Sequence, residues 1–291
     1  MGFRTVVVTS CSKCSYKNNY MVIQNEIVSM IHLSEIDVVI LDTTSVSITG
    51  VLLSELSKNK IVLLCCNERH MPSSIHMPLY SNVEFSGRFR TQIKWNKQIC
   101  NSVWNTILRH KISSEIHVLK FMGLSNLTID RLSDYLNDVG DIENNREGLA
   151  AKIYFSALFG EDFIRHEADG LNAALDYGYA MILSLVTREI VSYGFLPALG
   201  IHHDNNMNSF NLACDLMEPF RAIVDYVVAL HYEGIFDSDL KKCLWSIPDI
   251  EVIYKGRKQY LSNAIKGYCH SVLGVLDNSE CSDIEEVYYP C

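Results

Sequence analysis

The stretch that decides the fold is FNLACDLMEPFRAIVDYVVALHY, residues 210–232. Its apolar residues recur at intervals of three and four positions, which predicts a helix with one face in the protein core. Asp215 and Glu218 are three positions apart, so their carboxylates lie on the same face of that helix. The stretch therefore predicts a helical region that presents two acidic groups side by side.

The sequence before residue 210 has the same helical character back to about Phe89. One helix is predicted over Glu147–Phe159, where a following glycine provides a common helix-ending residue. A longer helix is predicted to start after Asp169, a good N-cap residue, and to run to about Ser192. The polar segment 201–209 then predicts a loop that leads into the deciding stretch.

The first 85 residues have a different pattern, with β-branched and apolar runs of strand length. Asn18-Asn19 predicts a tight hairpin turn, because asparagine tolerates positive φ angles. A helical pattern over Ser47–Lys58 separates two strands, and Met71–Pro78, with two prolines and two serines, predicts a closing loop. The predicted strands are Arg4–Thr9, Ser15–Lys17, Tyr20–Gln24, Ile36–Leu41 and Ile61–Cys66.

The sequence thus predicts an α+β protein with two domains, as its length of 291 residues favours. An N-terminal β-rich domain, residues 1–85, would precede a larger all-α catalytic domain, residues 86–291. Residues 86–100 would form the junction between them. We expect residues 276–291 to form a flexible tail.

The composition, with 48% hydrophobic and 20% charged residues, is typical of a globular protein. The longest apolar runs are well short of the roughly 18 residues needed to cross a bilayer, so no membrane association is expected. Most of the ten cysteines are scattered singly through apolar stretches, and the N-terminus does not have the pattern of a signal peptide. We therefore expect a cytoplasmic protein with reduced thiols.

The formal net charge of −9 at pH 7 argues against a protein that coats nucleic acid. More than half of that charge comes from five acidic residues within 276–291, a segment without Lys or Arg. Because charges are screened over about 8 Å at physiological salt, a local basic groove can still hold DNA. One basic run at the predicted junction suits such a groove, although a solvated helix surface is an equal interpretation. The run consists of Arg88, Arg90, Lys94 and Lys97, with Trp95 among them.

Carboxylate and imidazole groups recur at three places in the helical region. Glu147 falls in the first turn of its predicted helix, and His202 and His203 follow Gly200 in a predicted loop. Asp215 and Glu218 lie on the helix predicted over residues 210–232. Two or three carboxylates with one imidazole suit Mg²⁺ or Mn²⁺, since no thiolate is required. Three protein ligands would leave positions for water and phosphate oxygens, as phosphoryl transfer requires. On residue types alone, a solvated carboxylate at a helix start and a structural histidine explain the same residues.

Three segments together resemble a known protein family. They are Asn145–Phe155, Gly200–His203 and Asp215–Arg221. They look like the catalytic core of the CRISPR-associated endonuclease and integrase family, the universal component of spacer acquisition. The order of Glu147, His203 and Glu218 matches the family, as do the spacings of 56 and 15 positions. The segment Arg4–Tyr20 is similar to the N-terminal β-domain of the type II form in particular.

The resemblance implies a metal-dependent DNA integrase and endonuclease in which Glu147, His203 and Glu218 bind Mg²⁺ or Mn²⁺. A 3′-hydroxyl at the end of a captured double-stranded fragment would attack a phosphodiester at the edge of a CRISPR repeat. The reverse reaction would cleave branched DNA. The family's Gly-x-x-His pattern falls on His203, which leaves His202 near the phosphate or in a structural role. Asp215 would be an auxiliary ligand or a residue that supports a ligand.

The resemblance also implies partners. The β-domain would form a homodimer, and two dimers would flank the small second conserved acquisition protein, so that paired active sites act as a ruler for the inserted fragment. The type II likeness further implies an effector nuclease in the same operon. Arg146, Lys152 and Arg221 lie near the predicted ligands and could contact DNA phosphates. Ion pairing on a helix surface, for instance between Arg221 and Asp225, is the alternative.

Other motifs carry weaker signals. Residues 204–215 have the rhythm of a calcium-binding loop, but Ser209 replaces its glycine and Asp215 its glutamate. Cys11 and Cys14 form a CxxC without a second pair at zinc spacing. The turn after Leu41 lacks the glycines of a nucleotide-binding unit.

Two rival functions remain open at the level of the sequence. A metal-dependent phosphohydrolase of small molecules would have a closed pocket and no basic groove. A non-catalytic DNA-binding scaffold of the acquisition complex would tolerate loss of Glu147.

Overall fold

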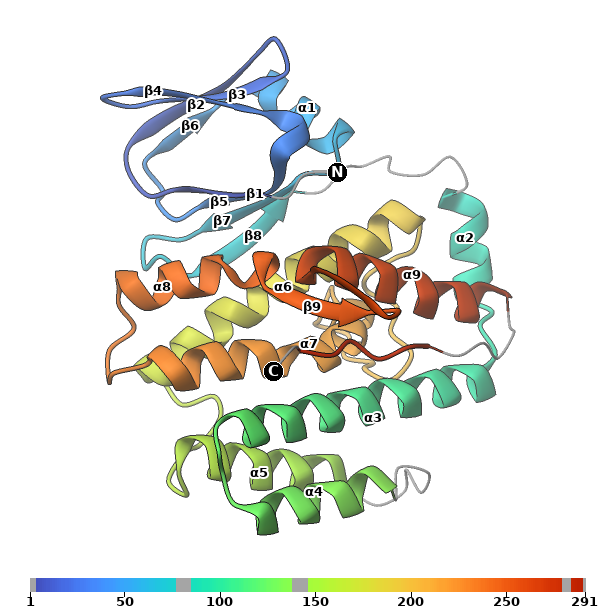
Figure 1. Ribbon diagram of the computed structural model, residues 1–291. Helices are drawn as coiled ribbons and strands as arrows, with labels where there is room; N and C mark the ends of the chain where they lie inside the picture. Colours follow the sequence, from blue (N-terminus) through green and yellow to red (C-terminus); the bar gives the residue numbers. More distant parts are fainter. Residues whose placement is uncertain (1–3, 77–84, 138–145, 279–283, 290–291) are drawn as a thin grey trace.

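The computed structural model describes residues 4–76, 85–137, 146–278 and 284–289, without the side chains of Asn137, Arg146 and Glu147. Figure 1 shows a strand-rich N-terminal part stacked on a larger, mostly helical part, so the predicted fold class is confirmed. The strand-rich part ends at His76, and the first helix of the second part begins at Phe85. A domain boundary near residue 85 therefore remains our proposal. None of the described helices is both long and apolar enough to cross a membrane.

Two four-stranded sheets build the N-terminal part. One has the order β1-β5-β7-β8, with β1, β5 and β7 parallel and β8 antiparallel; the other has the order β4-β3-β2-β6. The elements are β1 (Arg4–Val8), β2 (Ser12–Lys17), β3 (Tyr20–Gln24), β4 (Val28–His32), β5 (Ile36–Leu41), β6 (Val46–Ile48), α1 (Gly50–Lys58), β7 (Val62–Cys66) and β8 (Pro72–His76).

Strand β5 is buried along its whole length. Val38 and Ile40 point into the core shared with the helical part, whereas Val39 and Leu41 point into the core formed with α1 and the second sheet. Successive side chains of a strand alternate between its two faces, so this strand is apolar on both. That double burial explains why its sequence is a continuous apolar run and not an alternation.

The hairpin predicted at Asn18-Asn19 is confirmed, since β2 and β3 pair antiparallel across two residues with φ angles of 49° and 67°. The predicted closing loop over Met71–Pro78 is wrong in its described part, where Pro72–His76 forms strand β8. Pro72 is the first residue of a strand at the sheet edge, a position where the missing N–H of proline costs no ladder hydrogen bond.

The helical part contains α2 (Phe85–Gln92), α3 (Lys97–Phe121), α4 (Asn126–Asn137), α5 (Arg146–Phe159), α6 (Gly170–Tyr193), α7 (Asn211–His231), α8 (Ser238–Trp245) and α9 (Leu261–Asn278). It also contains a hairpin, β9 (Glu251–Tyr254) and β10 (Arg257–Tyr260), so it is not all-α as predicted. The hairpin turn is Lys255-Gly256, and both residues have positive φ.

Helix α6 runs through the middle of the helical part and is buried on nearly every face (Figure 1). Its predicted start is confirmed, because the Asp169 carboxylate accepts a hydrogen bond from the Asn172 N–H at 2.6 Å. It ends at Tyr193 and is capped by Gly194, whose φ of 98° belongs to the left-handed region that glycine adopts most easily. Helices α7, α8 and α9 pack against α6, and α3 packs along α7.

The C-terminal segment differs from the flexible tail we expected. Helix α9 continues to Asn278, and residues 284–289 pack on the helical part. Tyr288 pairs through its backbone with Ile253, and Val287 and Tyr289 on either side of it are buried. The Tyr289 hydroxyl donates to the carbonyl of Pro219 at 3.1 Å. This alternation is typical of a strand, and the many acidic residues around it obscured the pattern.

Buried ion pairs join the two parts at both ends of β5. The Arg188 guanidinium of α6 is 2.6 Å from Asp37 and 2.7 Å from Glu189. At the other end, the Lys241 ammonium of α8 is 3.3 Å from Asp42. Removing one partner of a buried pair leaves a charge that water cannot solvate, so such pairs fix relative position strongly.

We predict that Asp37→Ala lowers the free energy of unfolding by about 3 kcal/mol, because Glu189 is then the one acidic partner of Arg188 among the described residues. Urea unfolding followed by circular dichroism measures this loss. Glu35→Ala is the control, since it removes a solvent-exposed pair with Arg4 and should cost less than about 1 kcal/mol. Equal losses in the two variants would contradict the prediction.

Candidate active site

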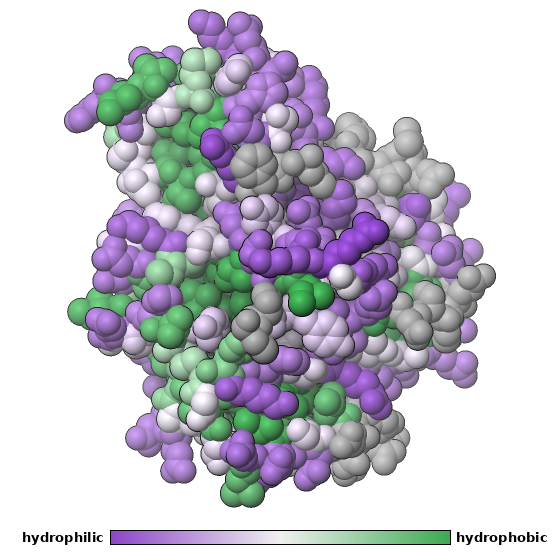
Figure 2. Space-filling model, in the orientation of Figure 1, coloured by the Kyte–Doolittle hydropathy of each residue, from purple (hydrophilic) through white to green (hydrophobic). Residues whose placement is uncertain are grey.

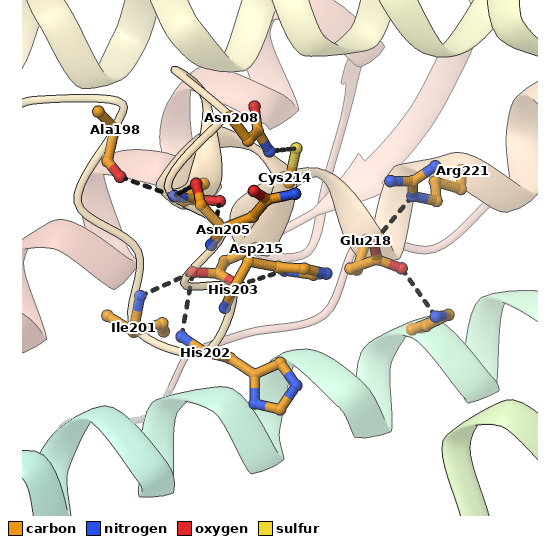
Figure 3. Close-up of polar contacts among 12 residues, drawn as sticks. Ala198, Ile201, His202, His203, Asn205, Asn208, Cys214, Asp215, Glu218 and Arg221 are labelled. Atoms are coloured by element: carbon orange, nitrogen blue, oxygen red, sulfur yellow. Dashed lines mark hydrogen bonds and ion pairs between the residues drawn. The ribbon is translucent and has the colours of Figure 1, made fainter.

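The loop between α6 and α7 carries the predicted histidines, and one asparagine anchors this loop to α7. The Asn211 amide nitrogen donates to the carbonyls of Ala198 at 3.1 Å and Asn205 at 3.0 Å. In return, its side-chain oxygen accepts from the Asn205 N–H at 3.3 Å. The loop backbone is therefore held at two points by the first residue of the helix (Figure 3).

Asp215 organises the turn that contains the histidines. One of its carboxylate oxygens accepts the N–H groups of Ile201 at 2.7 Å and His202 at 3.2 Å, and the other accepts the N–H of His203 at 3.0 Å. Its side chain has no exposed surface. A buried carboxylate that binds several backbone N–H groups is itself stabilised and holds the turn in one conformation.

Gly200 is required where this turn meets Asp215. A Cβ at this position would lie 2.2 Å from the His203 carbonyl oxygen and 2.8 Å from the Asp215 carboxylate. Both distances are shorter than atoms tolerate, so any side chain would push the turn away from the carboxylate.

The same carboxylate orients the His203 ring. The ring nitrogen Nδ1 is 2.7 Å from an oxygen of Asp215, which assigns the ring proton to Nδ1. The lone pair of a neutral imidazole then lies on Nε2, the nitrogen that would bind a metal ion. The His203 side chain is 39% exposed, so the site opens to solvent.

Glu218 lies one helical turn after Asp215 and is buried between two cations. Its oxygens are 2.9 Å from the Arg221 guanidinium and 2.8 Å from the Lys111 ammonium of α3. Burial alone would raise the pKa of Glu218, but the cations of Arg221 and Lys111, together with His203 when its ring is protonated, lower it to about 2. The carboxylate is therefore ionised at any physiological pH.

These groups fit a hard or borderline divalent cation, because an ionised carboxylate and a neutral imidazole are its usual donors. Both oxygens of Glu218 have cationic partners, so a metal ion would share this carboxylate with them. Among the described side chains, no three acidic, histidine or cysteine groups converge at ligand distance. Glu147 is in the first turn of α5, and its side chain lies outside the described residues.

A family model described as CRISPR associated protein Cas1 matches residues 5–239, which is most of the chain. The chain belongs to the Cas1 family. The family predicted from the three segments is therefore confirmed.

Related sequences agree with this membership. The chain is 34% identical over 236 residues to the CRISPR-associated endonuclease Cas1 of Neisseria meningitidis, covering 80% of this chain and 77% of that protein. It is 27% identical over 240 residues to a CRISPR-associated endonuclease Cas1 of Saccharolobus solfataricus, covering 78% and 75% of the two chains.

Solved structures show the same fold. A Cas1 protein from Thermotoga maritima superposes with a TM-score of 0.76 at 17% identity, covering 97% of this chain and all of that one. A casposase bound to its integration product superposes with a TM-score of 0.77 at 18% identity, covering 97% and 92%. At these identities the likeness concerns the fold alone.

In this Cas1-family chain, the two adjacent histidines have different surroundings. The His202 ring stacks on Trp104 of α3, with ring centres 4.0 Å apart and an angle of 4° between the planes. His203 instead faces Asp215 through its ring nitrogen. The geometry therefore supports the choice of His203 as the ligand and places His202 against α3.

Two residues of α3 that were not predicted from the sequence contribute to the site. Trp104 contacts both histidine rings, and Lys111 pairs with Glu218. They are seven positions apart, or two helical turns, and so lie on one face of the helix. A lysine two turns after a tryptophan on one face of the predicted helix was the signal that could have found this pair.

The predicted DNA-contact residues fall into different environments. Arg88 is 2.8 Å from Asp277 and packs over the ring of Tyr193, so it is committed within the fold. Arg221 binds Glu218 and not Asp225, the partner considered from sequence. Arg146 has no described side chain. The residues at the surface are Arg90, Lys94, Lys97 and Lys152.

A second buried acid lies on α7 two turns after Glu218. Asp225 accepts hydrogen bonds from the hydroxyls of Tyr154 on α5, at 3.1 Å, and Tyr179 on α6. Burial raises the pKa of Asp225 to about 7, and the two hydroxyls and Arg221 oppose that rise. Sequence reasoning did not single out this cluster, because its three members come from three helices.

The weaker motifs have structural explanations. Asp215, the last residue of the calcium-like pattern, is occupied by backbone N–H groups. Cys14 is fully buried in strand β2 and Cys11 is exposed, so the two thiols lie in different environments.

We predict that Asp215→Asn weakens Mn²⁺ binding by roughly 10- to 100-fold, the usual effect of removing a group that orients a metal ligand. The amide would turn a donor toward N–H groups that now find acceptors. Titration of the purified variant with Mn²⁺, followed by electron paramagnetic resonance of the free ion, measures the change. Asp204→Asn, an exposed acid next to His203, is the matched control. Unchanged affinity in the Asp215 variant would contradict the prediction.

Proposed function

We propose that this chain is a metal-dependent DNA endonuclease and integrase that inserts new spacers into a CRISPR array. One observation carries the proposal within a chain of the Cas1 family. A partly exposed imidazole, oriented by a buried carboxylate, lies beside a second carboxylate that is buried and ionised. The endonuclease names of the related proteins support the same reading.

In this proposal Glu147, His203 and Glu218 hold Mg²⁺ or Mn²⁺. When bound, the ion would activate the attacking oxygen and neutralise charge on the phosphate. Asp215 keeps the His203 proton on Nδ1, and Arg221 and Lys111 keep Glu218 ionised. The choice between the two metals rests on donor chemistry alone, since both accept oxygen and imidazole ligands.

The reaction is a transesterification in DNA. The 3′-oxygen of a captured fragment forms a new bond to phosphorus at the edge of the repeat, and the bond from phosphorus to the existing 3′-oxygen breaks. The attacking hydroxyl loses its proton, and the released 3′-oxygen gains one. Run in reverse, the same exchange resolves branched DNA. No protein side chain forms a covalent bond, which suits a site made of ligands and cations.

A polymeric substrate is favoured over a small phosphate ester. The 39% exposure of His203 describes an open site, whereas a phosphohydrolase of small molecules would enclose its substrate. The exposed cations Arg90, Lys94 and Lys97 lie in the first segment of the helical part, and we propose that they track a DNA backbone. Lys152, exposed on α5, would contact phosphate nearer the site.

We predict that Glu147→Ala, His203→Ala and Glu218→Ala each lower strand transfer by roughly 10²–10³-fold or more, because each removes a proposed ligand of the catalytic ion. Integration of a labelled fragment into a repeat-containing plasmid measures the loss. Glu233→Ala, an exposed acid beyond the end of α7, is the control. Normal integration by all three ligand variants would favour a non-catalytic scaffold.

We further propose that the strand-rich part forms a homodimer through the β4 edge. Strand β4 is at the edge of its sheet, and Ile27, Val28 and Met30 on or beside it are 73%, 59% and 50% exposed. Figure 2 shows apolar surface on the strand-rich part of the molecule around this end. An exposed apolar edge strand is a ready surface for a second chain.

The double variant Val28→Lys with Met30→Lys is predicted to shift the protein from dimer to monomer, because two charges would face the partner across the β4 edge. Sedimentation velocity at micromolar concentration measures this. Ile235→Lys is the matched control, since Ile235 is also 73% exposed but lies in the helical part. A double variant that sediments like the unaltered protein would place the dimer contact elsewhere.

The remaining partners follow from the same function. Two dimers would flank the small second conserved acquisition protein. A structural neighbour that is described as a Cas6-RT-Cas1–Cas2 complex, with a TM-score of 0.71 at 14% identity, is compatible with such an assembly. An effector nuclease of a type II system would supply a further partner. Both belong to the proposal.

A further inference from the structure

Asp225 is an almost completely buried carboxyl group that forms no ion pair among the residues that the structure describes. It is 2% exposed, and its two oxygens accept hydrogen bonds from Tyr154 and Tyr179, both of them neutral donors. Both tyrosines are buried as well, with exposed fractions of 0% and 6%. The cluster joins three helices, since Tyr154 comes from α5, Tyr179 from α6 and Asp225 from α7.

Such a cluster contributes less to stability than apolar side chains of the same volume would. Taking a carboxylate out of water costs several kcal/mol, and well-packed apolar residues in the same volume are often as stable or more so. What hydrogen bonds add over apolar packing is direction, because a hydroxyl and a carboxylate fix both distance and angle. The cluster therefore fixes the relative positions of its three helices more than it stabilises the fold.

The geometry that the cluster fixes includes the candidate site. Tyr154 is two helical turns after Glu147 on α5. On the other side, the Arg221 guanidinium lies over the Tyr179 ring, 4.8 Å from its centre, and donates to Glu218 at 2.9 Å. A continuous chain of contacts thus runs from α5 through Asp225 and Tyr179 to Arg221 and Glu218.

We propose that Tyr154, Tyr179 and Asp225 form a positioning cluster that sets the first turn of α5 relative to Glu218 and so determines the affinity of the site for its divalent ion. The inference rests on the proposed function, in which Glu147 and Glu218 share that ion. The three residues touch neither metal nor DNA in this role. They act through the helix that carries Glu147 and through the arginine that holds Glu218.

The experiment measures Mn²⁺ binding to purified full-length protein in the absence of DNA, using electron paramagnetic resonance of the free ion. Tyr154→Phe and Tyr179→Phe each delete one hydroxyl and keep the ring. We expect each to weaken Mn²⁺ binding by roughly tenfold, at the lower end of the range for groups that orient metal ligands. Asp225→Asn keeps the shape, loses one acceptor, and should give a similar loss.

Tyr177→Phe provides a closely matched control. Tyr177 is also on α6, two residues before Tyr179, is fully buried, and donates its hydroxyl to a buried aspartate, Asp42, at 3.3 Å. Asp42 pairs with Lys241 where the strand-rich part meets the helical part, and it is not part of the candidate site. The control should lower the melting temperature as much as Tyr179→Phe does, yet leave Mn²⁺ affinity within a factor of two.

The outcomes separate this inference from the proposed function. Glu218→Ala is measured alongside and should lose Mn²⁺ binding. If it does, and the Tyr154 and Tyr179 variants bind Mn²⁺ as tightly as Tyr177→Phe, the cluster is purely structural and the inference is overturned. If Glu218→Ala binds Mn²⁺ normally, the metal site itself is wrongly assigned, and the inference falls with it.

Discussion

One buried carboxylate determines the shape of the site. Asp215 accepts hydrogen bonds from three consecutive backbone N–H groups and from the His203 ring. The loop between α6 and α7 could adopt many conformations, and this acceptor selects one. Because Glu218 follows one turn later on the same rigid helix, the position of the imidazole relative to the second carboxylate is fixed by α7 itself. The rest of the site is built around that relation.

Charge balance extends the constraint to neighbouring helices. A carboxylate as buried as Glu218 needs compensation, which comes from Lys111 on α3 and Arg221 on α7. Arg221 is in turn held over the Tyr179 ring, which leads to Asp225 and α5. Within a chain whose net charge is −9, the buried charge of Glu218 is thus balanced locally by two cations. Local pairing, and not net charge, decides what such a surface can bind.

Helix caps, turn residues and hydrophobic periodicity predicted much of the fold, but few of the contacts between residues that are distant in the sequence. The Asp169 cap, the Asn18-Asn19 hairpin and the course of α7 depend on neighbours in the chain, so the sequence contains the information directly. The contact between Lys111 and Glu218 joins residues that are 107 positions apart, and no periodicity reports it. Strand β8 was not predicted, because its first residue is a proline. Proline is tolerated there because β8 is the edge strand of its sheet, which the sequence alone does not reveal. The roles of Glu147, His203 and Glu218 came from family resemblance, because isolated carboxylates and histidines are common on any helix.

The buried ion pairs between the strand-rich part and the helical part have a consequence for the proposed dimer. The second sheet, which includes β4, shares one core with β5, and β5 is tied to the helical part through Asp37 at one end and Asp42 at the other. A surface joined to its site by two buried ion pairs, and by a strand that packs into a core on each of its faces, cannot swing independently of that site. Two copies that met through β4 would therefore hold their sites at one separation. A fixed separation is what an enzyme needs if it is to insert DNA fragments of constant length, so the rigidity of this connection is as much a part of the proposed function as the ligands themselves.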